Sequence, residues 1–385
     1  MVENQYLNLE SVQGPSAKPK TQVNKGVILV TGSCGRIGAA VVKKLGTDYR
    51  MVGFELLKAF YASTNEELVP CDISSDESLH QALAHIRSFY GNTITAVIHL
   101  AAYYSFQHKQ SELYNKITVE GTRRLLRGLK GFNVGQFIFS STMLVHAPCE
   151  PGQKIDENWP IQAKWGYPAS KVKTERVIHD ERGDIPTVIL RISGVYDDDC
   201  HSIPISNQIQ RIYEHQLNAH LFAGKPSHGS DFMHLNDLVD AIAACVYLRK
   251  ELPEELTLLI GEGKTLSYEY LQNRISNLLY SRDIKTLAIP KTIAKFGAWV
   301  ENHAPFVHDE FIQPWMIDLA DDHYELDISR AKEILRWTPQ HSLDKTLPLM
   351  INSLKNDPIA WYKKNGLYMS PAVKKRIEEE QLAYK

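Results

Sequence analysis

The segment Val27-Ile-Leu-Val-Thr-Gly-Ser-Cys-Gly-Arg-Ile-Gly38 joins a short apolar β run to a glycine-rich turn. A helical pattern of apolar residues, from about Arg36 to Leu45, follows this turn directly. Residues without side chains let the backbone approach a pyrophosphate, and the N-terminus of the next helix offers N–H groups and positive dipole. Gly32, Gly35 and Gly38 therefore predict a strand–loop–helix unit that binds a dinucleotide.

Strand-like and helix-like segments alternate from this unit to about residue 191. Short apolar runs predict the strands, which are expected at 27–30, 49–54, 68–71, 94–100, 134–140 and 186–191. Apolar residues at helical spacing predict the helices, which are expected at 36–45, 75–89, 112–129 and 167–180. This order predicts an α/β fold built on a Rossmann-type, doubly wound parallel sheet with helices on both faces.

Glu55 ends the second expected strand, where a carboxylate accepts hydrogen bonds from ribose hydroxyls and repels a 2′-phosphate. The sequence therefore predicts NAD rather than NADP as the cofactor. Arg36 would instead favour NADP, because a cation in this loop could reach a 2′-phosphate. We expect Arg36 to be solvated or to contact phosphate. The alternative to a cofactor site is a tight turn followed by a surface glutamate.

Beyond residue 191 the alternation weakens, and proline, histidine and glycine become frequent. We therefore expect a smaller, mixed C-terminal substrate domain. The predicted division is a polar tail at 1–24, an NAD-binding Rossmann domain at 25–195, a substrate-binding domain at 196–230 and 249–345, and a helical extension at 346–385. Residues 231–248, which include a further expected helix, should pack back onto the first domain.

Composition narrows the class of protein. The 385 residues, 43% of them hydrophobic, are sufficient for a large core. The 43 Lys and Arg against 45 Asp and Glu lack the basic excess of a nucleic-acid-binding protein. No apolar stretch approaches the roughly 20 residues that span a bilayer. Five scattered cysteines, with neither a CxxC pair nor a signal peptide, predict a reduced, cytoplasmic protein without a metal site.

A second motif, Tyr167-Pro-Ala-Ser-Lys171, places a tyrosine and a lysine one helical turn apart, on the same face. A free tyrosine, with a pKa near 10, is a poor base at neutral pH. A neighbouring ammonium and an oxidised nicotinamide ring both favour the phenolate. Tyr167 could then exchange a proton with a substrate hydroxyl as hydride moves from or to the same carbon. The alternative is an ordinary pair on a helix surface.

A third feature is Phe137-Ile-Phe-Ser-Ser-Thr142, an expected strand that ends in hydroxyl side chains. Ligands of open α/β sheets bind at the carboxyl ends of the strands. We therefore expect Thr142 to bind the reacting oxygen and to orient Tyr167. Ser140 and Ser141 are expected to be strand-end residues that cap the backbone.

Together with His99-Leu-Ala-Ala102 and Leu190-Arg-Ile-Ser-Gly-Val-Tyr196, these motifs resemble the extended short-chain dehydrogenase/reductase family, of the NAD-dependent epimerase/dehydratase type. The similarity covers roughly residues 26–339. It includes the segment Phe232-Met-His-Leu-Asn-Asp-Leu238 and a closing segment at 327–339. The resemblance implies a Rossmann fold, a bound NAD, and hydride transfer assisted by Tyr167, Lys171 and Thr142.

The resemblance also implies contacts of individual residues with the cofactor. The implied cofactor-binding residues are Gly32, Gly35, Arg36, Ile37, Gly38, Glu55, Asp72, Ile73, Ala101, Ala102, Tyr167 and Lys171. Asp72 and Ile73 would contact the adenine, and Ala101 and Ala102 would lie along the cofactor. Relatives dimerise by packing two long helices of each subunit into a four-helix bundle. The matching segments here are 112–129 and the helix that starts near Tyr167, which implies a homodimer.

Departures from the family pattern narrow the chemistry. The 4,6-dehydratases of the family carry an acidic pair directly after the catalytic hydroxyl, because elimination of water needs its own acid and base. This chain has Met143 and Leu144 there, which cannot transfer protons. The decarboxylating and fucose-synthase types, which keep an acid or a cysteine there, are disfavoured as well. Simple dehydrogenases, reductases and 4-epimerases remain.

Further departures concern the substrate. The similar epimerases hold a nucleotide diphosphate with two arginines, where this chain has Ser230 and the acidic Asp321-Asp-His-Tyr324, and with an asparagine, where it has Gly194. Without these arginines a diphosphate would lack charge-assisted hydrogen bonds. The aromatic-rich segment at 289–315 could instead line an apolar pocket, or form the core of the second domain.

Some basic residues remain open to interpretation. His228, His234 and Arg211 could contact an anion, but each is expected to be a loop or structural residue. His201, His228 and His234 have a spacing that fits no usual metal site, so no metal is predicted.

The sequence therefore predicts an NAD(H)-dependent oxidoreductase that transfers hydride between nicotinamide and a secondary alcohol or ketone. The small-molecule substrate is expected to be uncharged or weakly charged, with an apolar part. A nucleotide-sugar 4-epimerase is the first alternative, because re-reduction of the ketone on its other face gives net epimerisation. A non-catalytic NAD-sensing protein is the second.

Overall fold

The computed structural model describes residues 25–56, 67–105, 109–296 and 313–383. The predicted polar tail at 1–24 and most of the aromatic-rich segment, at 297–312, lie outside the described residues. No described helix combines the length and apolar character needed to cross a membrane.

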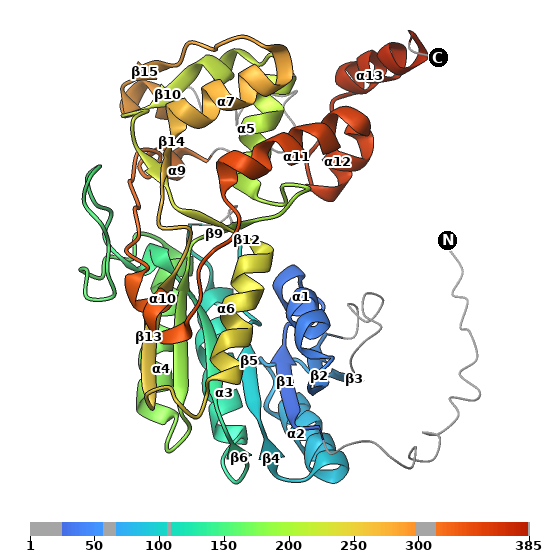
Figure 1. Cartoon of the computed structure of the whole chain (residues 1–385), viewed down its shortest axis with the longest axis vertical. Helices are drawn as coiled ribbons and strands as arrows, with labels where there is room; N and C mark the ends of the chain where they lie inside the picture. The colour runs from blue at the N-terminus through green and yellow to red at the C-terminus, as the bar shows by residue number, and fades with distance from the viewer. Residues whose placement is uncertain (1–24, 57–66, 106–108, 297–312, 384–385) are drawn as a thin grey trace.

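A seven-stranded parallel sheet forms the centre of the protein (Figure 1). Its strand order is β13-β8-β7-β5-β1-β2-β3. The strands are β1 (Val27–Thr31), β2 (Arg50–Glu55), β3 (Glu67–Pro70), β5 (Ala96–His99), β7 (Phe137–Thr142), β8 (Thr187–Ile192) and β13 (Glu255–Ile260). All neighbouring strands pair in parallel, which confirms the predicted Rossmann-type α/β fold.

Both faces of the sheet are covered, as the apolar strands require. Alternate residues of β1 enter different cores: Ile28 and Val30 belong to one, Val27 and Leu29 to the other. The first face carries α1 (Arg36–Leu45), α6 (Leu235–Tyr247) and α10 (Ser329–Leu335). The second carries α2 (Asp76–Tyr90), α3 (Glu120–Gly128) and α4 (Gly166–Glu181).

The edge strand β13 is a feature that the sequence pattern did not predict. It pairs along its whole length with β8, as Leu258 with Leu190. The range 249–345 was predicted as part of the substrate domain, but these six residues complete the main sheet instead. A six-residue apolar run carries no information on its pairing partner, which lies more than 60 residues earlier in the chain.

Two other elements differ from the expected ones. The helix expected at 112–129 begins with the π-helical η2 (Tyr114–Val119) before α3. The strands expected at 94–100 and 134–140 are each interrupted, which leaves the short pair β4 (Thr93–Ile94) and β6 (Asn133–Val134) outside the main sheet. Gly135 lies at this interruption, where a Cβ atom would come within 2.6 Å of the Thr95 carbonyl oxygen.

A second group of elements lies beyond the carboxyl ends of the sheet strands (Figure 1). Its core joins α5 (Ile203–Tyr213), α7 (Tyr268–Tyr280), α11 (Leu343–Asn356) and α12 (Pro358–Lys364). Three short strand pairs accompany these helices: β9 (Gly194–Tyr196) with β12 (Phe232–His234), β10 (Leu221–Ala223) with β15 (Leu287–Ile289), and β11 (Gly229–Ser230) with β14 (Leu266–Ser267). Further helices in the described part of the chain include η3 (Met143–Val145), η4 (Leu217–His220), α9 (Pro314–Ile317) and α13 (Pro371–Ala383).

Candidate active site

The glycine loop between β1 and α1 is packed too closely for a side chain at Gly32 or Gly38. Gly32 has a φ of +71°, in the left-handed region that favours glycine, and its N–H donates to the Phe54 carbonyl at 3.0 Å. A Cβ atom at Gly38 would come within 2.3 Å of the Gly32 carbonyl oxygen and 2.7 Å of the Ser33 Cα. This close packing of the loop onto α1 keeps backbone N–H groups accessible at the helix start, which fits a dinucleotide pyrophosphate.

Glu55 lies beside this loop, at the end of the neighbouring strand β2. Its Oε2 accepts a hydrogen bond from the Cys34 N–H at 3.1 Å, so the carboxylate borders the place expected for a ribose. Asp72 and Ile73 follow β3, the next strand along the sheet. Asp72 is exposed, whereas Ile73 is buried and packs against Gly121 of α3. The predicted cofactor residues of three strands thus gather at one edge of the sheet.

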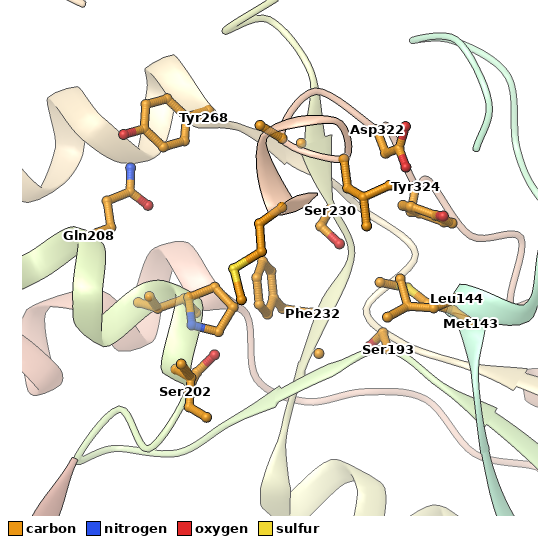
Figure 2. A pocket seen from close by; sticks show the side chains of 18 of the residues that line it. Met143, Leu144, Ser193, Ser202, Gln208, Ser230, Phe232, Tyr268, Asp322 and Tyr324 are labelled. Carbon is orange, nitrogen blue, oxygen red and sulfur yellow. The ribbon is translucent and has the colours of Figure 1, made fainter. Parts of the chain in front are cut away.

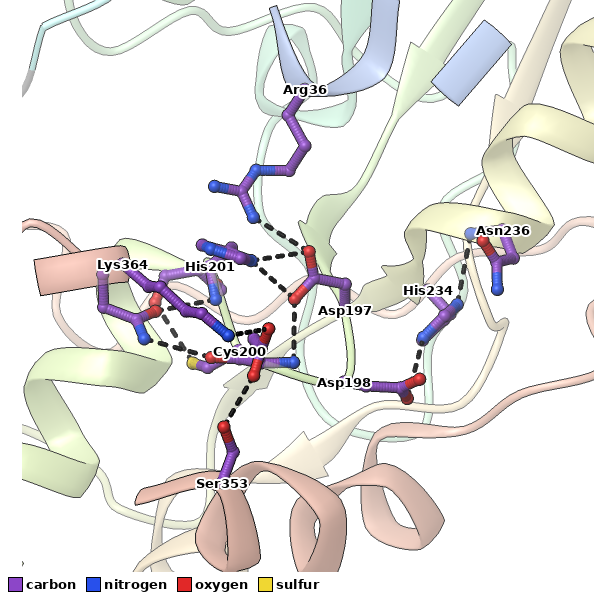
Figure 3. Close-up of polar contacts among 12 residues, drawn as sticks. Arg36, Asp197, Asp198, Cys200, His201, His234, Asn236, Ser353 and Lys364 are labelled. Carbon is purple, nitrogen blue, oxygen red and sulfur yellow. Dashed lines mark hydrogen bonds and ion pairs between the residues drawn. The ribbon is translucent and has the colours of Figure 1, made fainter. Parts of the chain in front are cut away.

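Arg36 pairs with an acid that the sequence did not predict as its partner. Its guanidinium donates to the Asp197 carboxylate at 2.8 Å (Figure 3). The same carboxylate accepts from Nδ1 of His201 at 2.7 Å, so Asp197 links the glycine loop to the segment that leads into α5. Asp197 lies 161 residues from Arg36, and local sequence patterns carry no information on such a pairing.

Tyr167, Lys171 and Thr142 meet where β7 ends against the start of α4. Lys171 Nζ donates to the Ser140 carbonyl at 2.7 Å and lies 5.6 Å from the centroid of the Tyr167 ring. Burial raises the pKa of Tyr167 above its usual range, while a hydrogen bond with Thr142 lowers it. The structure therefore brings together the three residues predicted to be catalytic.

Lys171 is buried, with only 2% of its surface exposed. This burial lowers its pKa to about 7, while the negative charge of Glu175 acts in the opposite direction. Glu175 in turn pairs with Arg191 at 2.7 Å and accepts from the Ser141 hydroxyl. The sequence pattern did not predict this supporting pair. The spacing of Glu175 from Lys171, one turn along α4, was the available signal.

The low pKa of Lys171 predicts a pH-dependent difference in stability between the native protein and Lys171→Met. Below pH 7 the ammonium is charged in the folded and unfolded states, so the full cost of its burial is present. As pH rises above 7 the folded state releases this proton first, and the cost declines. Between pH 7 and pH 9 the native protein should therefore gain about 2 kcal/mol relative to the variant.

Thermal or urea unfolding of both proteins from pH 6 to pH 9 measures this difference. Lys173→Met serves as the control, because it removes an exposed lysine from the same helix. A constant gap between the native protein and Lys171→Met would show that Lys171 keeps its proton throughout this range.

His99 supports the cofactor side of the site. Its Nδ1 lies 2.6 Å from the Thr31 hydroxyl and its Nε2 lies 2.8 Å from the Thr122 hydroxyl. Burial, together with the charge of Lys171, lowers the pKa of His99 to about 3, so the ring is neutral. The Thr31 hydroxyl also accepts from the Ala101 N–H at 3.2 Å. This network fixes the segment that leads into the predicted cofactor residues Ala101 and Ala102.

A cavity of about 920 Å³ opens from the catalytic residues toward α5 and α7 (Figure 2). Ile37, Ala102, Thr142, Tyr167 and Lys171, all predicted site residues, lie on its wall. Aromatic side chains flank the predicted acid/base as well. The ring centroid of Tyr167 lies 4.7 Å from that of Tyr104 and 5.5 Å from that of Trp165. The ring centroid of Trp165 lies in turn 5.2 Å from that of Trp315.

The residues that depart from the family pattern also border this cavity, which Met143, Leu144, Gly194 and Ser230 all line. The acids that replace the second arginine are already neutralised: Asp322 pairs with Lys164 at 2.6 Å, and Asp321 pairs with Lys291. Within the described ranges, no group of three or more histidine, cysteine or acidic residues is placed to hold a metal ion.

A family model described as "NAD dependent epimerase/dehydratase family" matches residues 28–261, which hold the glycine loop, Thr142, Tyr167 and Lys171. The chain belongs to this family. Its members form a class of enzymes, and the chain is an enzyme of that class. The match ends at Gly261, directly after β13, so the helices α7 and α11 of the second core lie outside it.

Similar proteins within the family act on different substrates. A UDP-glucose 4-epimerase of Schizosaccharomyces pombe is 27% identical over 308 residues, which cover 70% of this chain and 84% of that protein. The human 3 beta-hydroxysteroid dehydrogenase type 7 is 25% identical over a stretch that covers 63% of this chain and 68% of that protein. The crystal structure of UDP-glucuronic acid 4-epimerase from Bacillus cereus, in complex with UDP-glucuronic acid and NAD, has a TM-score of 0.65. It is 19% identical and covers 86% of this chain and 99% of that one.

Proposed function

We propose that this protein is an NAD(H)-dependent oxidoreductase that interconverts a secondary alcohol and a ketone. The arrangement of Tyr167 carries the proposal: its hydroxyl forms a hydrogen bond with Thr142, its ring centroid lies 5.6 Å from the Lys171 Nζ, and it lines a large cavity. A single acid/base with a supporting ammonium suffices for hydride transfer. The adjacent Met143 and Leu144 offer no second acid or base for an elimination.

The glycine loop fits NAD, since side chains at Gly32 and Gly38 would collide with the backbone. When bound, NAD supplies the hydride acceptor or, when reduced, the donor. The loop N–H groups would hold its pyrophosphate and Glu55 its ribose, while Lys171 would donate to the second ribose. In oxidation Tyr167 takes the proton of the substrate hydroxyl. In reduction Tyr167 returns this proton to the carbonyl oxygen, which Thr142 holds by a hydrogen bond.

The proposed substrate is an alcohol or ketone with an apolar part. A UDP- or dTDP-sugar would bring two phosphate charges, but the positions of the usual arginines hold Ser230 and acids that already pair with lysines. Each missing charge-assisted hydrogen bond would cost about 1.5–3 kcal/mol. Aromatic side chains such as Phe232 and Trp315 and aliphatic ones such as Leu271 line the cavity and offer apolar contact instead.

Two measurements test this function. The first is a screen of secondary alcohols and ketones, followed by absorbance at 340 nm with NAD and with NADH; net turnover of an apolar member is the expected result. The second is calorimetric titration of the NAD-loaded protein with UDP and with UDP-glucose, where no binding at micromolar concentration is expected. Micromolar binding of either nucleotide would contradict the proposed substrate class.

A nucleotide-sugar 4-epimerase is the second candidate, and the similarity to the S. pombe UDP-glucose 4-epimerase favours it. The two functions use the same tyrosine but differ in their net reaction. An epimerase re-reduces its ketone before releasing it, so it retains its cofactor and causes no net change at 340 nm. Conversion of UDP-galactose to UDP-glucose without such a change would establish this candidate.

Cofactor choice follows from Glu55. Its carboxylate borders the predicted ribose site and should repel a 2′-phosphate, so NAD should bind at least about tenfold more tightly than NADP. Glu55→Ser should narrow this gap mainly by improving NADP binding. Fluorescence titration of both cofactors against both proteins measures it. Equal affinities in the native protein would contradict this role of Glu55 and would point to release of Arg36 from Asp197 toward the phosphate.

The assembly and the location stay predictions. We propose a homodimer in which η2–α3 and α4 of each subunit form a four-helix bundle. These elements pack on one another within the subunit, where Arg123 and Arg127 both pair with Glu181. The cytoplasmic location rests on the sequence alone.

A further inference from the structure

The basic side chains on the cavity wall differ in whether they have an acceptor. Four of them have one: Lys164 pairs with Asp322 and His201 with Asp197. Lys171 forms a hydrogen bond with the Ser140 carbonyl, and His228 with the Asp321 carbonyl. Arg211 also lines the cavity and is half-buried. In the described part of the chain its guanidinium forms no hydrogen bond or ion pair. A lining residue of the cavity thus carries five donors in a fixed planar arrangement that have no acceptor among the described residues.

Helix α5 follows the cavity wall from Pro204 to Arg211. Pro204, Gln208 and Arg211 share one face of α5 and all line the cavity. Arg211 is roughly 10 Å farther along the helix than Pro204, at about 1.5 Å per residue. Figure 2 shows Gln208 across the cavity from Met143 and Leu144, which directly follow Thr142. One turn beyond Gln208, Arg211 therefore marks the far end.

The wall between these two ends is largely apolar. It includes Phe232, Leu271, Ile289 and Ile293, together with Trp315 near Tyr167. A ligand that extends from Tyr167 to Arg211 would therefore meet apolar side chains along most of its length and a cation at its end. A partly buried guanidinium without an acceptor is unfavourable, and an anionic group of the ligand would satisfy it.

From this arrangement we propose that Arg211 binds a single anionic group, such as a carboxylate, at the far end of an otherwise apolar substrate. The proposal rests on the oxidoreductase function only for the reacting end of that substrate. One guanidinium suits a monoanion, because it forms a bidentate pair with a carboxylate. Thus the structure adds a charged anchor to the weakly charged substrate that the sequence led us to expect, and assigns it to a residue expected to be structural.

A pair of fluorescent probes tests this anchor without requiring turnover. 8-Anilinonaphthalene-1-sulfonate carries one negative charge, and N-phenyl-1-naphthylamine has the same aromatic skeleton without it. Both are titrated against the full chain saturated with NAD, so that the cofactor site is closed to them. The native protein should bind the sulfonate at least about tenfold more tightly than the neutral probe, as expected for a charge-assisted pair.

Arg211→Met should weaken sulfonate binding by about tenfold or more and leave the neutral probe within about twofold. Arg211→Lys should restore part of the difference, because it keeps the charge but loses the bidentate geometry. Arg330→Met removes an exposed arginine of α10, outside the cavity, and should change neither affinity. Unchanged NAD affinity and unfolding temperature would show that the variants are folded.

Two results would overturn the proposal. One is a sulfonate affinity that stays within twofold in Arg211→Met. The other is displacement of the sulfonate by micromolar UDP, which would mean that this end accepts a nucleotide diphosphate. Tyr167→Phe should bind the sulfonate as the native protein does. Failure of the proposed chemistry therefore leaves this result unchanged, and the two proposals can fail separately.

Discussion

Tyr167→Phe should lower kcat by about a hundredfold to ten-thousandfold, the range that general acid–base catalysis supplies. Only the ionisable oxygen is removed, and the remaining ring keeps its contacts with Tyr104 and Trp165. NAD affinity and thermal stability should therefore stay close to those of the native protein. The measurement is steady-state turnover of an alcohol found in the substrate screen, beside fluorescence titration with NAD.

Tyr104→Phe provides the matched control, because Tyr104 is a second phenol on the same cavity wall, with its ring 4.7 Å from that of Tyr167. It should keep most of the activity. Thr142→Ser should lower the activity only slightly and Thr142→Val should lower it severely, since serine keeps the hydroxyl that hydrogen-bonds Tyr167. More than a few per cent of activity in Tyr167→Phe would mean that another group moves the proton, and the proposed mechanism would be wrong.

The parts of this site that the sequence predicted are those that depend on short-range geometry. Tyr167 and Lys171 face the same way because they lie one turn apart on α4. The glycine loop follows from a strand, a turn and a helix in immediate succession. Thr142 meets Tyr167 because the carboxyl ends of parallel strands share one edge of the sheet. Each of these inferences needs only a motif and the fold class.

The parts that the sequence did not predict depend on contacts between remote segments. Arg36 pairs with Asp197 only because the segment after β9 returns to the glycine loop. The largely buried pair of Glu175 and Arg191 joins α4 to β8, and the local sequence around Glu175 does not show that Arg191 is its partner. For Arg211 the sequence could not decide between a structural and an anion-binding role, because the absence of an acceptor is visible only in the folded chain.

Gly38→Ala should reduce NAD affinity by at least about a hundredfold and lower the free energy of unfolding by about 1–3 kcal/mol, as expected for overpacking. The new Cβ would lie 2.3 Å from the Gly32 carbonyl oxygen, 2.7 Å from the Ser33 Cα and 2.8 Å from the Ser33 carbonyl oxygen. All three are backbone atoms, so no side chain can rotate away. Alanine gains about 1 kcal/mol over glycine within a helix, which offsets only part of this cost.

To relieve the contact, α1 must move away from the loop. The N–H groups at the start of α1 then no longer point toward the pyrophosphate. Gly35→Ala separates the effect on stability from the effect on NAD binding. Its Cβ would lie 3.2 Å from the Gly32 carbonyl oxygen, and its φ of −68° suits any residue, so stability should stay near that of the native protein. It should still weaken NAD binding, because it projects a methyl group from the loop that the pyrophosphate must approach. Urea unfolding without cofactor and fluorescence titration with NAD measure both variants. If Gly38→Ala unfolds like Gly35→Ala, the close packing of the loop onto α1 does not contribute to stability as described.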